Sequence, residues 1–147
     1  MSTENAAEFR WPVRVYYEDT DAAGLVYYAN YLKFFERCRT EWLRSIGYEQ
    51  RAIGHDEQAA FVVAKLQVDY IRPARLDDAL TITATVTEQK GATLLFAQRA
   101  VCVAPDVEHL LASAQVKIVC IHPQSLKPRP LPRGLLEAMR DTLSDTY

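Results

Sequence analysis

An acidic loop that runs into a helix carries the residues of this chain best suited to chemistry. Within residues 17–31, Asp21 lies three positions before the glycine Gly24, and a helical segment follows. The first turn of a helix leaves backbone N–H groups unpaired, and these amides stabilise negative charge. A carboxylate beside them can attack a polarised carbonyl or activate water while the amides hold the oxyanion. The alternative is that Asp21 only shapes the turn or caps the helix. For Asp19, in the same loop, we expect a structural or electrostatic role.

A strand predicted for residues 10–17 and a helix predicted for residues 30–46 flank this loop. Apolar side chains recur along the helix at steps of three and four, which is typical of one buried face; they are Tyr31, Phe35, Cys38, Trp42 and Ile46. Asn30 is expected to cap the helix, and Gly47 is expected to end it.

After the helix the hydrophobic period changes to two, which predicts strands at residues 62–70, 80–87, 93–103 and 110–121. Short turns at 90–91 and 105–108 imply antiparallel pairing. Each strand has one mainly apolar face, such as Val62, Ala64, Leu66, Val68 and Tyr70 in the first and Ala112, Ala114, Val116, Ile118 and Cys120 in the last. One amphipathic helix and a sheet with one apolar face predict a two-layer α+β fold.

The last part of the chain has a different composition. Four of the seven prolines lie between His122 and Pro132, which predicts an extended linker, and residues 133–147 return to helical spacing. We expect this helix to cap the body or to contact a partner. The domain boundaries expected are therefore 1–126 for the body and 127–147 for the Pro-rich linker and C-terminal helix.

Composition narrows the functional classes. The chain has 147 residues, 49% of them hydrophobic, and a net charge of −2, which fits one folded domain and argues against a nucleic-acid surface. No segment approaches the run of about 20 apolar residues that a membrane span requires. With no signal-peptide pattern at its start, the chain is expected to be cytoplasmic. The three cysteines are expected to be buried free thiols, because each lies in an otherwise apolar periodic segment. No Cys/His cluster has metal-ligand spacing.

The stretch YYEDTDAAGLVYYANYLKFFERCRTEWLRSIG resembles the signature of the hotdog-fold acyl-CoA thioesterases. It is similar to the 4-hydroxybenzoyl-CoA thioesterase family and, within it, to the YbgC branch associated with the Tol–Pal envelope system. The resemblance covers residues 14–126 and implies a hotdog fold, in which an antiparallel sheet of about five strands wraps one central helix. It also implies hydrolysis of acyl-CoA or acyl-carrier-protein thioesters, which needs no metal or redox cofactor.

The resemblance implies a set of catalytic positions. Asp21 falls at the catalytic aspartate, as general base or nucleophile. From its residue type, Gly24 allows a tight turn and the close approach of a ligand to the backbone, and a pure turn role is equally consistent with the sequence. The oxyanion donor is expected at the backbone N–H near Tyr28. Many members of the YbgC branch have histidine at that position, whereas this chain has tyrosine, so a histidine-assisted mechanism is excluded.

Substrate-binding positions follow from the same resemblance. Asn30 and Tyr31 match the family pattern, as does Glu36, for which a role in positioning a loop is an alternative to a purely structural one. Lys90 matches a family position that contacts the nucleotide part of CoA, and the alternative is an ordinary solvated lysine.

Related proteins assemble as homodimers or homotetramers with active sites at the subunit boundary, and pairing would also cover the exposed edge of a five-stranded sheet. The main alternative function is a non-catalytic hotdog module that binds an acyl thioester or a partner protein. A dehydratase on the same fold is disfavoured, because no histidine lies where the helix begins.

Overall fold

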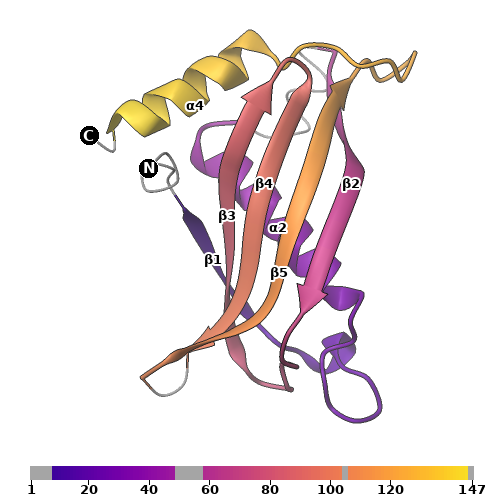
Figure 1. Cartoon of the computed structure of the whole chain (residues 1–147), viewed down its shortest axis with the longest axis vertical. Coiled ribbons are helices and arrows are strands. Elements are labelled where there is room, and N and C mark those ends of the chain that lie inside the picture. The colour runs from indigo at the N-terminus through magenta and orange to yellow at the C-terminus, as the bar shows by residue number, and fades with distance from the viewer. Residues whose placement is uncertain (1–7, 49–57, 104–105, 146–147) are drawn as a thin grey trace.

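The computed structural model describes residues 8–48, 58–103 and 106–145, and five strands within them form one antiparallel sheet. The strands are β1 (Phe9–Arg14), β2 (Ala60–Tyr70), β3 (Ala79–Lys90), β4 (Thr93–Val103) and β5 (Glu108–Ile121). Their order across the sheet is β1-β3-β4-β5-β2, so β1 and β2 form the two edges. Figure 1 shows the central helix α2 (Asn30–Ser45) lying across one face of this sheet. The predicted α+β hotdog architecture is therefore confirmed.

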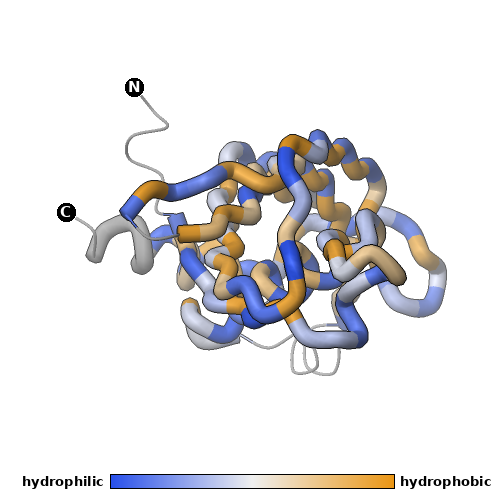
Figure 2. The backbone as a smooth tube through the Cα atoms, turned by 90° about the horizontal axis from the view of Figure 1, so that it is seen from below, coloured by the Kyte–Doolittle hydropathy of each residue, from blue (hydrophilic) through white to orange (hydrophobic). Residues whose placement is uncertain are grey.

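Packing between α2 and the sheet forms the hydrophobic core. Five apolar side chains of α2 are buried, namely Tyr31, Phe34, Phe35, Cys38 and Leu43, while Trp42 and Ile46 are partly buried beside them. The predicted inner face of β5 is confirmed, because Ala112, Ala114, Val116, Ile118 and Cys120 are all buried. Hydrophobic and hydrophilic residues alternate along the chain when the molecule is viewed from below (Figure 2).

The helix begins at Asn30 and ends next to Gly47, as the sequence predicts, but its N-cap residue differs. Gly47 adopts a φ of +96° just past the helix, where the amide of Tyr48 bonds to the carbonyl of Leu43. The prediction that Asn30 caps the helix is wrong. Ala29 occupies the cap position, and Asn30 is the first helical residue.

The prediction of a single apolar face along β2 is also wrong. A β-bulge between Val63 and Lys65 adds a residue, and this reverses the side on which later side chains lie. Phe61 and Val63 line a small pocket on the α2 side, whereas Lys65 and Gln67 line a hollow on the opposite face of the sheet. Val62 therefore faces away from the core, and Val63 takes the inner position.

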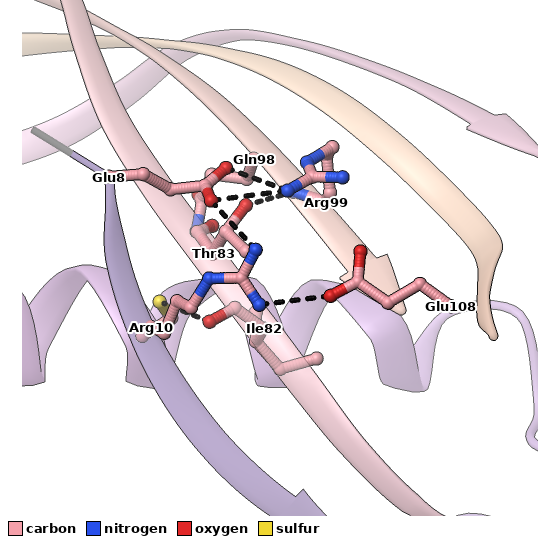
Figure 3. A network of polar contacts seen from close by, with 8 residues as sticks. Glu8, Arg10, Ile82, Thr83, Gln98, Arg99 and Glu108 are labelled. Atoms are coloured by element: carbon pink, nitrogen blue, oxygen red, sulfur yellow. Dashed lines mark hydrogen bonds and ion pairs between the residues drawn. The ribbon is translucent and has the colours of Figure 1, made fainter. Parts of the chain in front are cut away.

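The first strand ends earlier than predicted, at Arg14 rather than at residue 17. A short 3-10 helix, η1 (Tyr17–Asp19), follows because the amide of Tyr16 bonds to the Asp19 carboxylate. On the outer face of the sheet, ion pairs join Glu8 to Arg10 and Arg99, and join Arg10 to Glu108, around the buried Thr83 (Figure 3). This network ties the first strand to β4 and to the start of β5.

Beyond β5 the chain crosses the end of the sheet next to the β3–β4 turn and forms helix α4 (Arg133–Asp145) (Figure 1). Leu131 and Pro132 are buried, and the amide of Leu131 bonds to the carbonyl of Gly91 in the β3–β4 turn. Leu135 is fully buried, so α4 caps the body, as one of the two predicted roles requires. The predicted turn at 90–91 is confirmed, whereas the turn at 105–108 lies partly outside the described residues. In the described part of the chain, no helix is long and apolar enough to cross a membrane.

Candidate active site at the start of the central helix

The acidic loop forms a small hairpin at the end of the sheet where α2 begins (Figure 1). Its two sides pair through Thr20 and Val26, and the amide of Val26 also bonds to the carbonyl of Ala74. The carbonyl of Gly24 accepts a hydrogen bond from Leu76. Backbone contacts to the segment that leads into β3 therefore hold the loop in place.

Asp21 lies near the tip of this hairpin and is exposed in the single chain. Its Oδ1 accepts hydrogen bonds from the amides of Ala23, at 2.9 Å, and Leu25, at 3.2 Å. Gly24 adopts a φ of +78°, which lets the chain turn within this short span. The turn-shaping role that the sequence left open for Asp21 is therefore present. Within the described residues, Oδ2 accepts no hydrogen bond, which leaves this oxygen accessible to a ligand.

Asp19 holds the base of the hairpin against the helix. Its side chain is buried, and Oδ2 accepts from the amide of Tyr16 at 2.8 Å. Oδ1 accepts from the side-chain amide of Asn30 at 2.7 Å, and the backbone carbonyl accepts from Tyr27. Asn30 is thus buried and committed to this carboxylate, which explains why it does not act as a cap.

Within the described part of the chain, two backbone amides immediately before α2 are unpaired, whereas the amides of its first turn are not. Asn30, Tyr31 and Leu32 donate to carbonyls three residues earlier, at 2.8, 3.4 and 3.1 Å. The amides of Tyr28 and Ala29, just before them, donate to no acceptor among the described residues. Two adjacent free N–H groups at the positive end of a helix are a suitable oxyanion site.

Four tyrosines surround this helix start. The rings of Tyr27 and Tyr28 lie 4.8 Å apart, and Tyr70 lies edge-on to Tyr28 at 6.1 Å and to Tyr31 at 5.6 Å. Tyr31 is buried, and its hydroxyl accepts a hydrogen bond from the amide of Ala74. Tyr27 and Tyr28 are exposed, so their rings can line the approach to the free amides.

The surroundings of three of these tyrosines raise the pKa of their hydroxyl groups. A hydrogen bond with the Tyr28 hydroxyl raises the pKa of Tyr27, and burial raises the pKa of Tyr31. Burial, together with the nearby Tyr28, also raises the pKa of Tyr70. Tyr27, Tyr31 and Tyr70 therefore keep their hydroxyl protons at neutral pH.

Sequence reasoning placed Tyr70 on a strand but missed its contact with the helix. Its hydroxyl donates a 2.9 Å hydrogen bond to the carbonyl of Tyr28. Forty-two positions separate the two residues, and only the strand pairing brings the end of β2 beside the start of α2. A tyrosine at the end of a predicted strand carries no local signal of such a contact.

Lys90 lies far from Asp21 in the single chain. It ends β3 at the β3–β4 turn, whereas the acidic loop contacts residues just before β3 begins. The 12 residues of β3 span roughly 35–40 Å. Lys90 lines a hollow of about 680 Å³ on the outer face of the sheet, together with Lys65 and Lys117.

Glu36 does not face the loop, and its Oε2 accepts a hydrogen bond from Thr40 one helical turn later. It lines a second, mainly apolar pocket of about 130 Å³ between α2, the sheet and α4, which also contains Arg39, Trp42 and Leu135. Among the described residues, no cluster of His, Cys, Asp and Glu side chains could hold a metal ion.

The architecture defines the class as an α+β hotdog protein in which two free amides directly precede the central helix. A sequence profile described as the thioesterase superfamily matches residues 23–107, which include Gly24, Tyr28 and Lys90 and begin two residues after Asp21. The chain therefore belongs to the thioesterase superfamily.

Individual relatives support this assignment. The chain is 50% identical over 133 residues to an acyl-CoA thioester hydrolase, YbgC, of Escherichia coli O6:H1, covering 90% of this chain and 96% of the relative. It is 47% identical over 130 residues to an acyl-CoA thioesterase, YbgC, of Haemophilus influenzae, covering 88% of this chain and 93% of that one. The crystal structure of a 1,4-dihydroxy-2-naphthoyl-CoA thioesterase from Synechocystis superposes with a TM-score of 0.83 at 27% identity, covering 92% and 97% of the two chains. The expected relationship to the YbgC branch is confirmed.

Proposed function

We propose that this chain hydrolyses acyl-CoA thioesters to the free acid and CoA. The observation that carries the proposal is the pair of unpaired amides, Tyr28 and Ala29, where α2 begins. A thioester carbonyl oxygen placed there would gain hydrogen bonds as negative charge develops on it, and one such donor contributes about 3–4 kcal/mol to the transition state. The names of the E. coli and H. influenzae relatives support the same reaction.

Asp21 supplies the attack on the carbonyl carbon in this proposal. Its free Oδ2 either adds to that carbon and expels the CoA thiolate, which leaves an acyl anhydride for water to cleave, or removes a proton from an attacking water. The two loop amides that bond to Oδ1 orient the carboxylate for either step. Because a thiolate is a good leaving group, no general acid is required. Asn30 and Tyr31 contribute by holding the loop and the helix start in place around the bound substrate.

A complete site requires a second copy of the chain. Val62, Val63 and Leu66 are exposed on the edge strand β2, and an unpaired edge of this kind favours strand pairing. We propose a homodimer, or a tetramer built from dimers, in which two β2 strands pair antiparallel across a two-fold axis. The Tyr70 end of one β2 then lies beside the Val62 end of the other.

That pairing places Lys90 of one chain at the same end of the dimer as Asp21 of the other. Lys90, Thr93, Val119 and Val62 form one row across the sheet, so Lys90 lies three strands, or roughly 15 Å, from the β2 edge. The CoA nucleotide can then bind beside Lys90 while its acyl end reaches the partner's loop. A phosphopantetheine arm on a carrier protein would offer the same thioester.

Release of free thiol from short, long and aromatic acyl-CoAs tests the proposal, with Asp21→Asn compared to the wild type. Asparagine keeps an oxygen for the amides of Ala23 and Leu25, so the loop should survive while kcat falls about 10²-fold to 10⁴-fold. Glu18→Gln, in the same loop, is the matched control and should retain activity. If the wild type binds acyl-CoA without hydrolysing it, the non-catalytic alternative holds; if Asp21→Asn keeps its kcat, another group performs the attack.

A further inference from the structure

The side chain of Tyr70 joins the edge strand β2 to the start of the central helix. Tyr70 is the last residue of β2, and its hydroxyl donates a 2.9 Å hydrogen bond to the carbonyl oxygen of Tyr28. Its ring packs edge-on against Tyr28 and Tyr31. The side chain is still 47% exposed, so its packing contribution to the core is small.

The carbonyl that Tyr70 contacts belongs to the peptide group whose amide is Ala29. Within the helix start, this oxygen receives only a long 3.4 Å contact from the amide of Tyr31, because Leu32 donates to Ala29 instead. Tyr70 is therefore its main hydrogen-bond partner among the described residues. A strong donor on a peptide carbonyl fixes the plane of that peptide and polarises its N–H group.

We propose that Tyr70 is a positioning residue, which holds the Tyr28–Ala29 peptide so that its free amide points at the developing oxyanion. This inference rests on the proposed thioester hydrolysis. Tyr70 does not contact the substrate carbonyl itself, and it acts through the backbone amide that does. Because an oxyanion donor is worth more when it is preorganised, loss of the hydroxyl should slow the chemical step and leave substrate binding unchanged.

The position of Tyr70 also links catalysis to assembly. Tyr70 is the last residue of the strand along which a second copy is proposed to pair, so pairing with the partner strand would restrict the movement of the Tyr70 side chain. The oxyanion peptide of each chain would then be held by an element at the subunit boundary.

Tyr70→Phe is the test, because it removes the hydroxyl and keeps the ring contacts. We expect kcat to fall about threefold to tenfold with KM unchanged, as for the loss of one hydrogen bond. The amide ¹H–¹⁵N resonance of Ala29 should shift, while the melting temperature stays close to that of the wild type. Tyr17→Phe is the matched control, since this ring is 83% exposed and the same hydroxyl deletion there should change neither kcat nor the resonance.

Restoring a hydrogen-bond donor at position 70 distinguishes a positioning role of Tyr70 from a packing role. Incorporation of 4-aminophenylalanine at position 70 keeps the ring and an N–H donor, and it should restore kcat to within about twofold of the wild type. If Tyr70→Phe keeps wild-type kcat, or raises KM alone, the inference is wrong while the proposed hydrolysis stands. If the wild type releases no thiol from any acyl-CoA, the proposed function fails and this inference fails with it, whatever the Ala29 resonance does.

Discussion

The side-chain amide of Asn30 donates a 2.7 Å hydrogen bond to Oδ1 of Asp19, and both side chains are buried. This bond fastens the first residue of the central helix to the base of the acidic loop. Asp19 is also bonded to the amide of Tyr16, so one carboxylate joins three segments of the chain. The acidic loop and the free amides before α2 therefore depend on a residue that is not itself expected to react.

Breaking this contact should destabilise the fold. In Asn30→Ala, the Asp19 carboxylate stays buried but loses its charge-assisted partner, and we expect the free energy of unfolding to fall by about 2–3 kcal/mol. Urea denaturation monitored by circular dichroism measures this difference. Gln89→Ala, at the exposed end of β3, is the control and should change stability by less than about 0.5 kcal/mol. An equally small change in Asn30→Ala would show that water replaces the amide.

A charge on the edge strand should separate the subunits. Val62 faces outward and is 41% exposed, so Val62→Glu would place a carboxylate on the proposed pairing edge without disturbing the core. Light scattering should change from oligomer to monomer, and acyl-CoA hydrolysis should be lost with the subunit boundary. Val107→Glu, at a more exposed apolar position (60%) away from β2, should leave both unchanged. A monomeric Val62→Glu protein with full activity would refute the shared site.

Removal of the Lys90 ammonium should weaken binding of CoA rather than slow the chemistry. We expect Lys90→Ala to raise KM for an acyl-CoA by about tenfold at low salt, less at high salt, with kcat nearly constant. An N-acetylcysteamine thioester lacks the nucleotide, so its hydrolysis should not respond to the substitution. Lys127→Ala, outside the lysine-lined hollow, is the control. An equal effect on both substrates would show that Lys90 does not act through the nucleotide part of CoA.

The Cys38 thiol should be unreactive in the folded protein. Burial raises its pKa from an ordinary value of 9.0 to about 12, and its Sγ lies 3.5 Å from the carbonyl of Ile82. Mass spectrometry after iodoacetamide treatment at pH 8.5 should find Cys38 unmodified in buffer and modified in urea.

The same shift predicts how stability depends on pH. Between pH 9 and about 12 the unfolded chain releases a proton that folded Cys38 keeps, so the free energy of unfolding should fall as pH rises through this window. Cys38→Ala should remove the contribution of this thiol to the fall of the free energy of unfolding with pH. Rapid labelling of native Cys38 at pH 8.5 would instead indicate frequent local opening of α2.

Local patterns in the sequence predicted most of the fold. Periods of 3.6 and two residues are imposed by backbone geometry, so the helix, the β3–β4 hairpin and the inner face of β5 could all be recognised without neighbours. The bulge in β2 could not be recognised in this way, because it is defined by the pairing of β2 with β5 and not by the residues of β2 alone. The sequence also could not show that Asn30 bonds to Asp19 instead of capping the helix, because both roles suit an asparagine at the start of a helix.

By itself, the sequence determined that an aspartate and a glycine precede a helix, and that this segment resembles a thioesterase signature. Only the tertiary structure decided which backbone amides are free. That structure decided as well that one carboxylate oxygen of Asp21 accepts hydrogen bonds from its own loop, and that the Tyr70 hydroxyl donates to the Tyr28 carbonyl. It also decided that Lys90 and Asp21 lie at opposite ends of the sheet. The physical reason is that spacing governs contacts within one element, whereas contacts between elements depend on strand order and register, which residues far apart in the chain set together.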